Sequence, residues 1–239
     1  MLEVEMDLEK SLDNVPLLKE VFASIAHQWR GPLSQINSII GSIDNRLYEL
    51  NIDDPFITQN LLQVEAITKE MSQSIDDYRG CIGGVKIKSS LQELLVTTIK
   101  SVAAGLESNG IALEQAFEKS AEFHGDEQLL KQVVITLVDN AKDALVSRNV
   151  YKPFIKITSE ADEDSLFIKI CDNAGGISKS VRSKIFEADF TTKHNSEGTG
   201  LGLFMAKKLL SQKMDAKLSV ENKESGACFT IEIPRNENE

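Results

Sequence analysis

The sequence predicts an α+β protein, in which a helical hairpin is followed by an α/β-sandwich domain with a mixed sheet. From about residue 3 to about residue 82, apolar residues recur at steps of three and four, interrupted once by the turn-forming segment Asn51–Pro55. From residue 89 onward, helical and strand-like patterns are interleaved. The glycines within residues 80–84 indicate a hinge, so we expect domains over residues 1–83 and 84–239.

Length and charge limit the class of protein. The chain has 239 residues, of which 41% are hydrophobic, and this is enough for one large or two small domains with a packed core. Lys and Arg number 26 against 37 Asp and Glu, a net charge of −11 that argues against nucleic-acid binding. The acidic start does not resemble a signal peptide, and the chain has no apolar run of about 18 residues. We therefore expect a cytoplasmic chain, or the cytoplasmic part of a longer receptor, that makes no membrane contact itself.

The cysteines give no pairing signal. Cys81, Cys171 and Cys228 are odd in number and widely spaced, and the sequence has no C-x-x-C motif. Neither a zinc site nor a disulfide framework is therefore expected. Reduced thiols are the simplest expectation in the cytoplasm.

The first half is expected to form two helices with a shared apolar seam. Thr68 is the one polar residue in the second of these patterns. A hairpin of two helices has too little core by itself, so dimerisation into a four-helix bundle would bury the remaining apolar faces. A structural coiled coil without chemistry would give the same pattern.

His27 is singled out by its place in the first helix. It is two residues from both Ile25 and Trp29, and at about 100° per residue it lies opposite the seam that they define. Pro32 removes one helical hydrogen bond and crowds the carbonyl of Gln28, so a kink is expected beside His27. Broken local rules often mark function, although a tolerated bend remains the alternative.

The second half is expected to alternate helices and strands. Ser89–Ser90 precedes a helix that ends at about Glu107, and Asp126 caps a second helix that runs to about Leu145. A further helix is expected after the glycine-rich stretch at residues 198–202. The expected strands are residues 111–117, 154–158, 166–170, 217–221 and 228–233, with the second and third paired and the last two forming a hairpin.

Two polar stretches point to a ligand. Asn140 and Asp143 are three residues apart on one helix face, and an amide oxygen suits Mg²⁺ that is already bound to phosphates. Asp172 ends a strand before Asn173-Ala174-Gly175-Gly176, where a carboxylate can accept from an exocyclic amine. A solvated helix face and an ordinary Asp/Asn turn are the respective alternatives.

The stretch Gly198-Thr199-Gly200-Leu201-Gly202 precedes an apolar helical run. Glycine allows close backbone approach, and the helix start offers N–H groups and the positive end of its dipole, so a phosphate site is expected. The spacing fits neither a dinucleotide-binding fingerprint nor a P-loop. An ordinary glycine-rich loop remains possible on this stretch alone.

Five segments in order resemble the sensor histidine kinases of two-component systems. They are HQWRGPL (27–33), DNAKDA (139–144), DNAGGI (172–177), FTTK (190–193) and GTGLGL (198–203). The resemblance covers about residues 20–235. The second half is similar to the GHKL ATPase fold of gyrase and some chaperones, and the first half to the dimerisation and histidine-phosphotransfer bundle.

The resemblance implies a role for each matching position. His27 would accept the γ-phosphoryl group of ATP, with Gln28 and Arg30 beside it, and Asn140 would hold Mg²⁺. A receiver aspartate of a response regulator would then take the phosphoryl group, in a homodimer driven by an upstream sensor domain or protein. The implied nucleotide contacts are Asn140, Asp143, Asp172, Gly176, Thr192, Lys193, Gly198, Thr199, Gly200, Leu201 and Gly202, with Thr192 and Lys193 starting a lid.

Four positions depart from the family pattern. Gln28 stands where an acidic residue is common, so it can orient His27 but cannot act as a carboxylate base. Gly31 replaces the usual Thr or Asn, which predicts that phosphatase activity toward the regulator by this route is weak or absent. Thr136 replaces an amide near Mg²⁺, and Ala174 replaces a loop glycine and is tolerated only at negative φ.

These departures leave two alternatives to a histidine kinase. The first is a GHKL ATP-binding dimer that acts as a conformational scaffold. The second is a serine kinase on the same nucleotide fold, which would need no heptad hairpin. An exposed histidine beside Pro32 argues against the scaffold.

Overall fold

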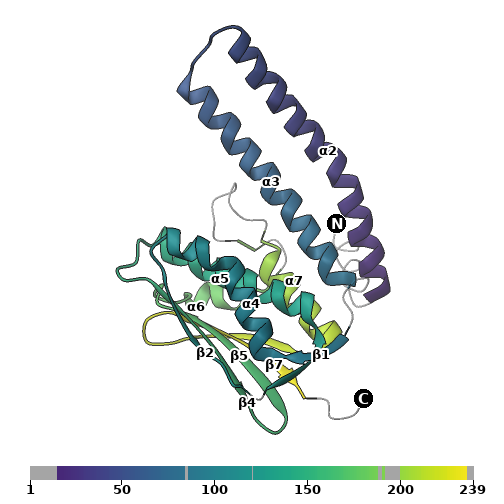
Figure 1. Ribbon diagram of the computed structural model, residues 1–239, viewed down its shortest axis with the longest axis vertical. Helices are drawn as coiled ribbons and strands as arrows, with labels where there is room; N and C mark the ends of the chain where they lie inside the picture. Colours follow the sequence, from purple (N-terminus) through teal and green to yellow (C-terminus); the bar gives the residue numbers. More distant parts are fainter. Residues whose placement is uncertain (1–14, 84–85, 120, 188–189, 192–199, 236–239) are drawn as a thin grey trace. The chain divides into compact units, whose positions relative to one another are not determined.

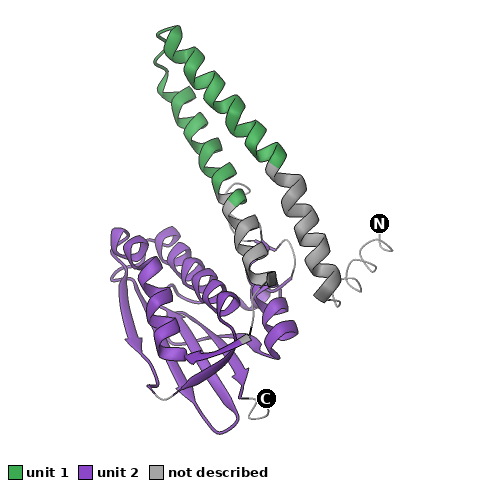
Figure 2. Ribbon diagram, turned by 45° about the vertical axis from the view of Figure 1, so that its right-hand side comes forward, with its two compact units in different colours: residues 1–83, 195–197 green, residues 84–194, 198–239 purple. Residues whose placement is uncertain are grey.

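The computed structural model describes residues 15–83, 86–119, 121–187, 190–191 and 200–235, with the backbone alone for residues 15–30, 70, 73–83 and 86. The chain divides into two compact units at residues 83 and 84 (Figure 2). In the described ranges, unit 1 is a helical hairpin and unit 2 contains all the strands. No helix in these ranges has the length and apolar character needed to cross a membrane.

Unit 1 consists of α2 (Val15–Glu49) and α3 (Pro55–Gly83), which run side by side (Figure 1). The helical pattern of the sequence predicts both. α2 continues through Pro32 as helix. In the turn, Asn51 has φ 52° and the Asp54 carboxylate accepts the Phe56 N–H at 2.9 Å, which caps the start of α3.

A polar pair lies in the seam of this hairpin. Thr68 is 3% exposed, and its hydroxyl oxygen is 2.5 Å from the side-chain oxygen of Asn37 on α2. Because a buried polar group needs its partner, this contact favours one register of α3 against α2. Thr68, the one polar residue in the apolar pattern of the second helix, therefore contacts the first helix.

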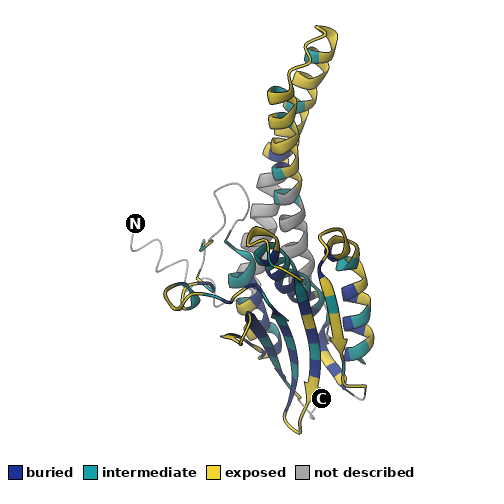
Figure 3. Ribbon diagram, turned by 90° about the vertical axis from the view of Figure 1, so that its left-hand side faces the viewer, coloured by how far each residue is buried: buried dark blue, intermediate teal, exposed yellow. Residues whose placement is uncertain are grey.

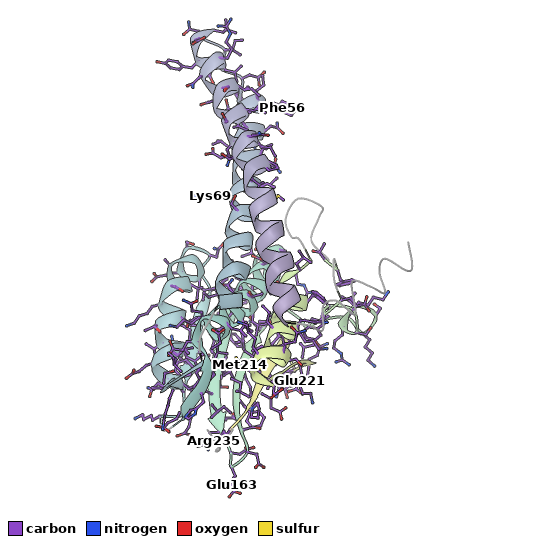
Figure 4. The ribbon with its side chains drawn as sticks, turned by 90° about the vertical axis from the view of Figure 1, so that its right-hand side faces the viewer. Phe56, Lys69, Glu163, Met214, Glu221 and Arg235 are labelled. Atoms are coloured by element: carbon purple, nitrogen blue, oxygen red, sulfur yellow. A yellow bond between two sulfur atoms is a disulfide. The ribbon has the colours of Figure 1, made fainter. Side chains whose placement is uncertain are left out.

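Most of the described residues of the hairpin are exposed (Figure 3), and several of them carry large apolar side chains. Phe56 is 76% exposed, and Figure 4 shows it near the tip of the hairpin. Other large apolar side chains exposed on the hairpin are Ile36, Ile39, Ile43, Tyr48, Leu50, Ile52, Leu62 and Val64. An apolar surface of this extent is typical of an interaction face.

Unit 2 is built on a mixed five-stranded sheet with the order β2-β4-β5-β7-β6. β2 pairs parallel with β4, and the other pairs are antiparallel, which confirms the predicted mixed sheet. Figure 4 shows Glu163 at the turn between β4 and β5. The strands are β2 (Ala112–Ala116), β4 (Phe154–Ala161), β5 (Ser165–Asp172), β6 (Lys217–Asn222) and β7 (Ala227–Pro234).

A second, two-stranded sheet pairs β1 (Lys86–Ser90) with β3 (Glu122–Asp126), and no strand was expected in either segment. Both strands are five residues long and carry weak alternation. The short helix α6 (Lys179–Arg182) was not expected either.

Three longer helices cover one face of the sheet (Figure 1). They are α4 (Leu91–Ser108), α5 (Glu127–Ser147) and α7 (Gly202–Met214). Ser90 and Asp126 cap α4 and α5 as predicted, accepting the N–H groups of Glu93 and Leu129. Alternate strand residues fill the core against these helices, including Ile155, Ile157, Leu166, Ile168, Ile170, Ile231 and Ile233.

Cys171 and Cys228 form a disulfide, so the expectation that no cysteine is paired in this way is wrong. The two residues are separated by 57 positions in sequence, yet they stand opposite each other in the β5–β7 register, with Cα atoms 4.0 Å apart. Sequence spacing carries no information about register between distant strands, and this is why the pairing was missed.

A buried ion pair joins α5 to α7. Asp126 Oδ1 caps α5, while Oδ2 lies 2.9 Å from Lys213 Nζ in the last turn of α7. The side chains of Asp126 and Lys213 are 4% and 11% exposed. Removing one member of such a pair leaves the other charge buried without compensation.

We expect Lys213→Met to lower the free energy of unfolding by about 3 kcal/mol, because it leaves the Asp126 carboxylate buried beside an apolar chain. Lys88→Met is the matched control, because Lys88 and its partner Glu122 are both exposed, with Nζ and Oε2 2.8 Å apart, and an exposed ion pair contributes little to stability. Urea unfolding of both variants measures the difference. Equal losses would contradict a structural role for the buried pair.

Candidate functional site

Asp172 is the buried acid at the end of β5. It is 7% exposed, and its Oδ1 accepts the N–H of Ala174 at 2.8 Å and that of Ala227 at 3.2 Å. Within the described part of the chain, no hydrogen bond reaches Oδ2. One carboxylate oxygen thus holds two segments of backbone together, and the other is left to accept from a ligand.

Burial raises the pKa of Asp172, while the two backbone N–H groups and the charge of Arg148 lower it; burial is the larger effect. The ionised carboxylate is therefore less stabilised than it would be in water. A donor on a bound ligand would supply part of the missing stabilisation, so the site favours ligands that carry an N–H donor.

Arg148, the residue after α5, clamps the loop that follows Asp172. Its Nη1 donates to the carbonyl oxygens of Ala174 and Gly176, the latter at 2.9 Å. A planar guanidinium has several donors in fixed directions and is suited to holding two carbonyls at once. Arg148 therefore fixes the loop shape and adds a positive charge close to Asp172.

The same loop also rests on the β6–β7 turn. The amide of Asn222 accepts the N–H of Ile177 at 2.9 Å and donates to its carbonyl at 2.8 Å. Gly175 donates its N–H to the carbonyl of Ser225 at 2.8 Å. These bonds join the loop to the opposite strand ends, so its conformation is set before any ligand binds.

Glycine is required at three places here, for two different reasons. Gly175 and Gly176 have φ of 83° and 78°, values that other residues rarely adopt. At Gly226 the reason is space, because a Cβ atom would lie 1.9 Å from the carbonyl oxygen of Asp172. Ala174 is buried and does not have positive φ, so this position meets the requirement of negative φ under which alanine can replace a loop glycine.

Asn140 and Asp143 are half-buried on α5, which contacts β4 and β5. They lie three residues apart, with Thr136 one turn before Asn140, and Lys142 pairs with Asp139 at 2.6 Å. The described residues contain no group of three His, Cys, Asp or Glu side chains that would hold a metal. A neutral amide suits Mg²⁺ that arrives already bound to phosphates and water, so this donor set fits a nucleotide-borne ion.

The glycine-rich stretch leads directly into α7. Gly200 has φ 68°, and α7 starts at Gly202 without a side-chain cap on its first turn. The first turn of a helix presents N–H groups that have no partner within the helix, and these bind anions. Gly200, Leu201 and Gly202 therefore lie at the start of a helix, which is the local geometry that the predicted anion site requires.

The structure brings Asp172 and Gly176 together in one loop. Asn140 and Asp143 lie on α5, and Gly202 begins α7. His27, Gln28 and Arg30 lie on α2, where the backbone alone is described. Thr192, Lys193, Gly198 and Thr199 lie outside the described residues.

Sequence reasoning missed Arg148, Asn222 and Gly226. Arg148 and Asn222 are ordinary polar residues at the ends of elements and carry no signal. Gly226 follows Glu224–Ser225 and resembles any turn glycine.

Comparison with known proteins agrees with this fold. The family described as "Histidine kinase-, DNA gyrase B-, and HSP90-like ATPase" matches residues 125–237. The signal transduction histidine-protein kinase AtoS of Escherichia coli (strain K12) is 27% identical over 226 residues, covering 94% of this chain and 36% of AtoS. Sporulation kinase A of Bacillus subtilis (strain 168) is 26% identical, covering 93% of this chain and 36% of that kinase. The chain thus spans about a third of the length of these two curated relatives.

Two solved structures extend the comparison. The nucleotide-free catalytic domain of the histidine kinase ThkA matches with a TM-score of 0.56 and 28% identity, covering 63% of this chain and 95% of that domain. ThkA in complex with the response regulator protein TrrA matches with a TM-score of 0.61 and 25% identity, covering 97% of this chain and 66% of that one.

Unit 2 therefore has the fold of the histidine kinase-, gyrase- and HSP90-like ATPases, and the Asp172 loop lies within the matched residues. The matches to AtoS, sporulation kinase A and the ThkA complex along nearly the whole chain confirm its resemblance to the two-component sensor histidine kinases.

We expect Gly226→Ala to lower the free energy of unfolding by about 1–3 kcal/mol, because the new methyl group meets the backbone of Asp172. Gly105→Ala is the matched control. Gly105 lies within α4 with no atom near its Cβ direction, so alanine should raise stability by about 0.5–1 kcal/mol. Thermal unfolding of both variants measures the effects. A neutral Gly226→Ala would show that the close approach to Asp172 is not needed.

Proposed function

We propose that the chain is the kinase core of a sensor histidine kinase. Unit 2, as a catalytic domain over residues 84–239, would bind ATP with Mg²⁺. Residues 1–83 would form the dimerisation and phosphotransfer domain, with His27 as the phosphoacceptor. The observation that supports this most is Asp172, a buried acid with one oxygen tied to backbone and the other left for a ligand donor.

Adenine is the base that fits this acceptor. Its exocyclic amine would donate to Asp172 Oδ2, and the glycine-containing loop would let the ring approach the backbone. A base with a carbonyl at the same position would place two acceptors against each other, which costs binding free energy. The site therefore favours ATP over nucleotides that carry an oxo group there.

The remaining implied contacts divide by the part of the nucleotide that they meet. Asn140 would hold Mg²⁺, with Asp143 on the same helix face. Gly198, Thr199, Gly200, Leu201 and Gly202 would line the phosphates, and Thr192 and Lys193 would begin the lid. Phosphoryl transfer needs mostly positioning and neutralisation of charge, and these groups are suited to both.

His27 would act as the nucleophile in its neutral form. The ring nitrogen forms a bond to the γ-phosphorus while the bond from that phosphorus to the β–γ bridging oxygen breaks, and ADP leaves. Arg30 would offset the phosphoryl charge. Gln28 would hold the second ring nitrogen by a hydrogen bond, and because an amide takes no proton, the ring proton would pass to water.

The proposed partners follow from the hairpin and from the relatives. The exposed apolar residues of α2 and α3 support a homodimer, in which a second hairpin would cover them. A response regulator is supported by ThkA, which is solved in complex with one. An upstream sensor is supported by the greater length of the curated relatives, which extend beyond the matched region.

Incubation with γ-labelled ATP and Mg²⁺ tests the proposal. We expect acid-labile, base-stable label on the wild-type chain and its complete loss in His27→Ala, because the acceptor nitrogen is gone. His124→Ala is the matched control, since His124 is exposed on β3 and should leave labelling unchanged.

Two outcomes would contradict this assignment. Label that persists in His27→Ala would move the acceptor elsewhere. Bound nucleotide with no label on the wild-type chain would favour the scaffold.

A further inference from the structure

The Cys171–Cys228 disulfide lies directly beside the candidate base-binding acid. Cys171 precedes Asp172 on β5, and Cys228 follows Ala227 on β7. Asp172 and Ala227 are themselves joined by the hydrogen bond from the Ala227 N–H to Asp172 Oδ1. The disulfide therefore joins β5 and β7 one residue away from this hydrogen bond.

The sheet does not need this link to hold β5 and β7 together. The two strands pair continuously from Ser165 opposite Pro234 to Cys171 opposite Cys228. The disulfide closes the end of this ladder at the loop, where the backbones of Gly226 and Asp172 come into close approach. Its main effect is thus on the spacing of the strand ends that carry Asp172 and Ala227.

Cys171 is also the more accessible of the two sulfur-bearing residues. On β5, half-buried Phe167, Lys169 and Cys171 alternate with buried residues of the helix-covered face. Cys171 and its register partner Cys228 therefore both lie on the other face of the sheet, but Cys228 is covered there and is only 1% exposed. A thiol from solution would reach the sulfur of Cys171 first.

We propose that thiol–disulfide exchange at Cys171 and Cys228 regulates nucleotide binding at Asp172. This inference rests on the proposed nucleotide site. In the reducing direction, a thiolate attacks Cys171 Sγ, forms a mixed disulfide and releases the Cys228 thiolate. A second thiolate then attacks the mixed disulfide and releases Cys171, so one protein disulfide becomes two thiols while two small thiols become one disulfide.

The disulfide form should bind nucleotide more tightly. The link restricts the strand ends before the ligand arrives, so less conformational freedom is lost on binding. Linkage is reciprocal, so bound nucleotide must oppose reduction of the disulfide by the same factor. The two effects can be measured independently on one protein.

The test uses the full chain with Cys81→Ser, which removes the third thiol. ADP with Mg²⁺ is titrated by calorimetry into the oxidised form and into the form reduced with dithiothreitol, after thiol counting has verified each state. We expect a Kd about fivefold or more lower for the oxidised form, the lower range of coupling between linked sites. The matched control adds Cys171→Ala and Cys228→Ala, and its Kd should not change with dithiothreitol.

A second measurement equilibrates the same protein with a glutathione redox buffer, with and without saturating ADP. Agreement between the shift in this equilibrium and the ratio of the two Kd values supports the inference. Equal Kd values in two verified redox states would overturn it and leave the nucleotide site intact. A dithiothreitol effect that persists in the double alanine variant would also overturn it, and absence of ADP binding in both states would overturn the nucleotide site itself.

Discussion

The contact between Asp172 and the start of β7 sets the geometry of the site. One carboxylate oxygen binds two backbone N–H groups from segments more than 50 positions apart, and Gly226 allows the backbones to meet. Arg148 and Asn222 then hold the loop after Asp172 from α5 and β6. The loop is therefore organised by bonds within unit 2, and a ligand meets an acceptor that is already in place.

The sequence was sufficient to predict the elements that depend on local chemistry. Ser90 and Asp126 were recognised as caps, and the five strands of the larger sheet and the longer helices of unit 2 were placed by their periodicity. The polar Thr68 was noticed as an exception, but its partner Asn37 lies 31 residues away on the other helix. Contacts of that kind depend on register, which periodicity leaves open.

The parts that were missed share this dependence on distant strands. The Cys171–Cys228 disulfide and the fit of Gly226 against Asp172 both arise from the β5–β7 register. The β1–β3 sheet arises from a pairing between short strands. The site residues recognised in advance lie in compact motifs, whereas the supporting residues Arg148 and Asn222 become visible only when the sheet brings them to the loop.

The buried acid also has consequences for stability. Because burial raises the pKa of Asp172, its folded-state pKa is above the usual value, and the ionised form at neutral pH lowers the stability of the fold. The stability lost in this way is recovered as the pH falls through the raised pKa of Asp172, because the carboxyl group becomes protonated. An acid kept at such a cost is typical of a group retained for function.

The measurement that tests the adenine site most directly is titration of ATP and inosine triphosphate into wild type and Asp172→Asn. The amide oxygen of Asn can still accept from Ala174 and Ala227, while its NH₂ group replaces the acceptor Oδ2 with a donor. We expect ATP affinity to fall about tenfold to a hundredfold, from the loss of one charged hydrogen bond. The preference of Asp172→Asn should shift from ATP toward inosine triphosphate. Its free energy of unfolding at pH 7 should equal or exceed that of the wild type. Unchanged affinity for both nucleotides in the variant would contradict the assignment of Asp172 as the base-reading residue.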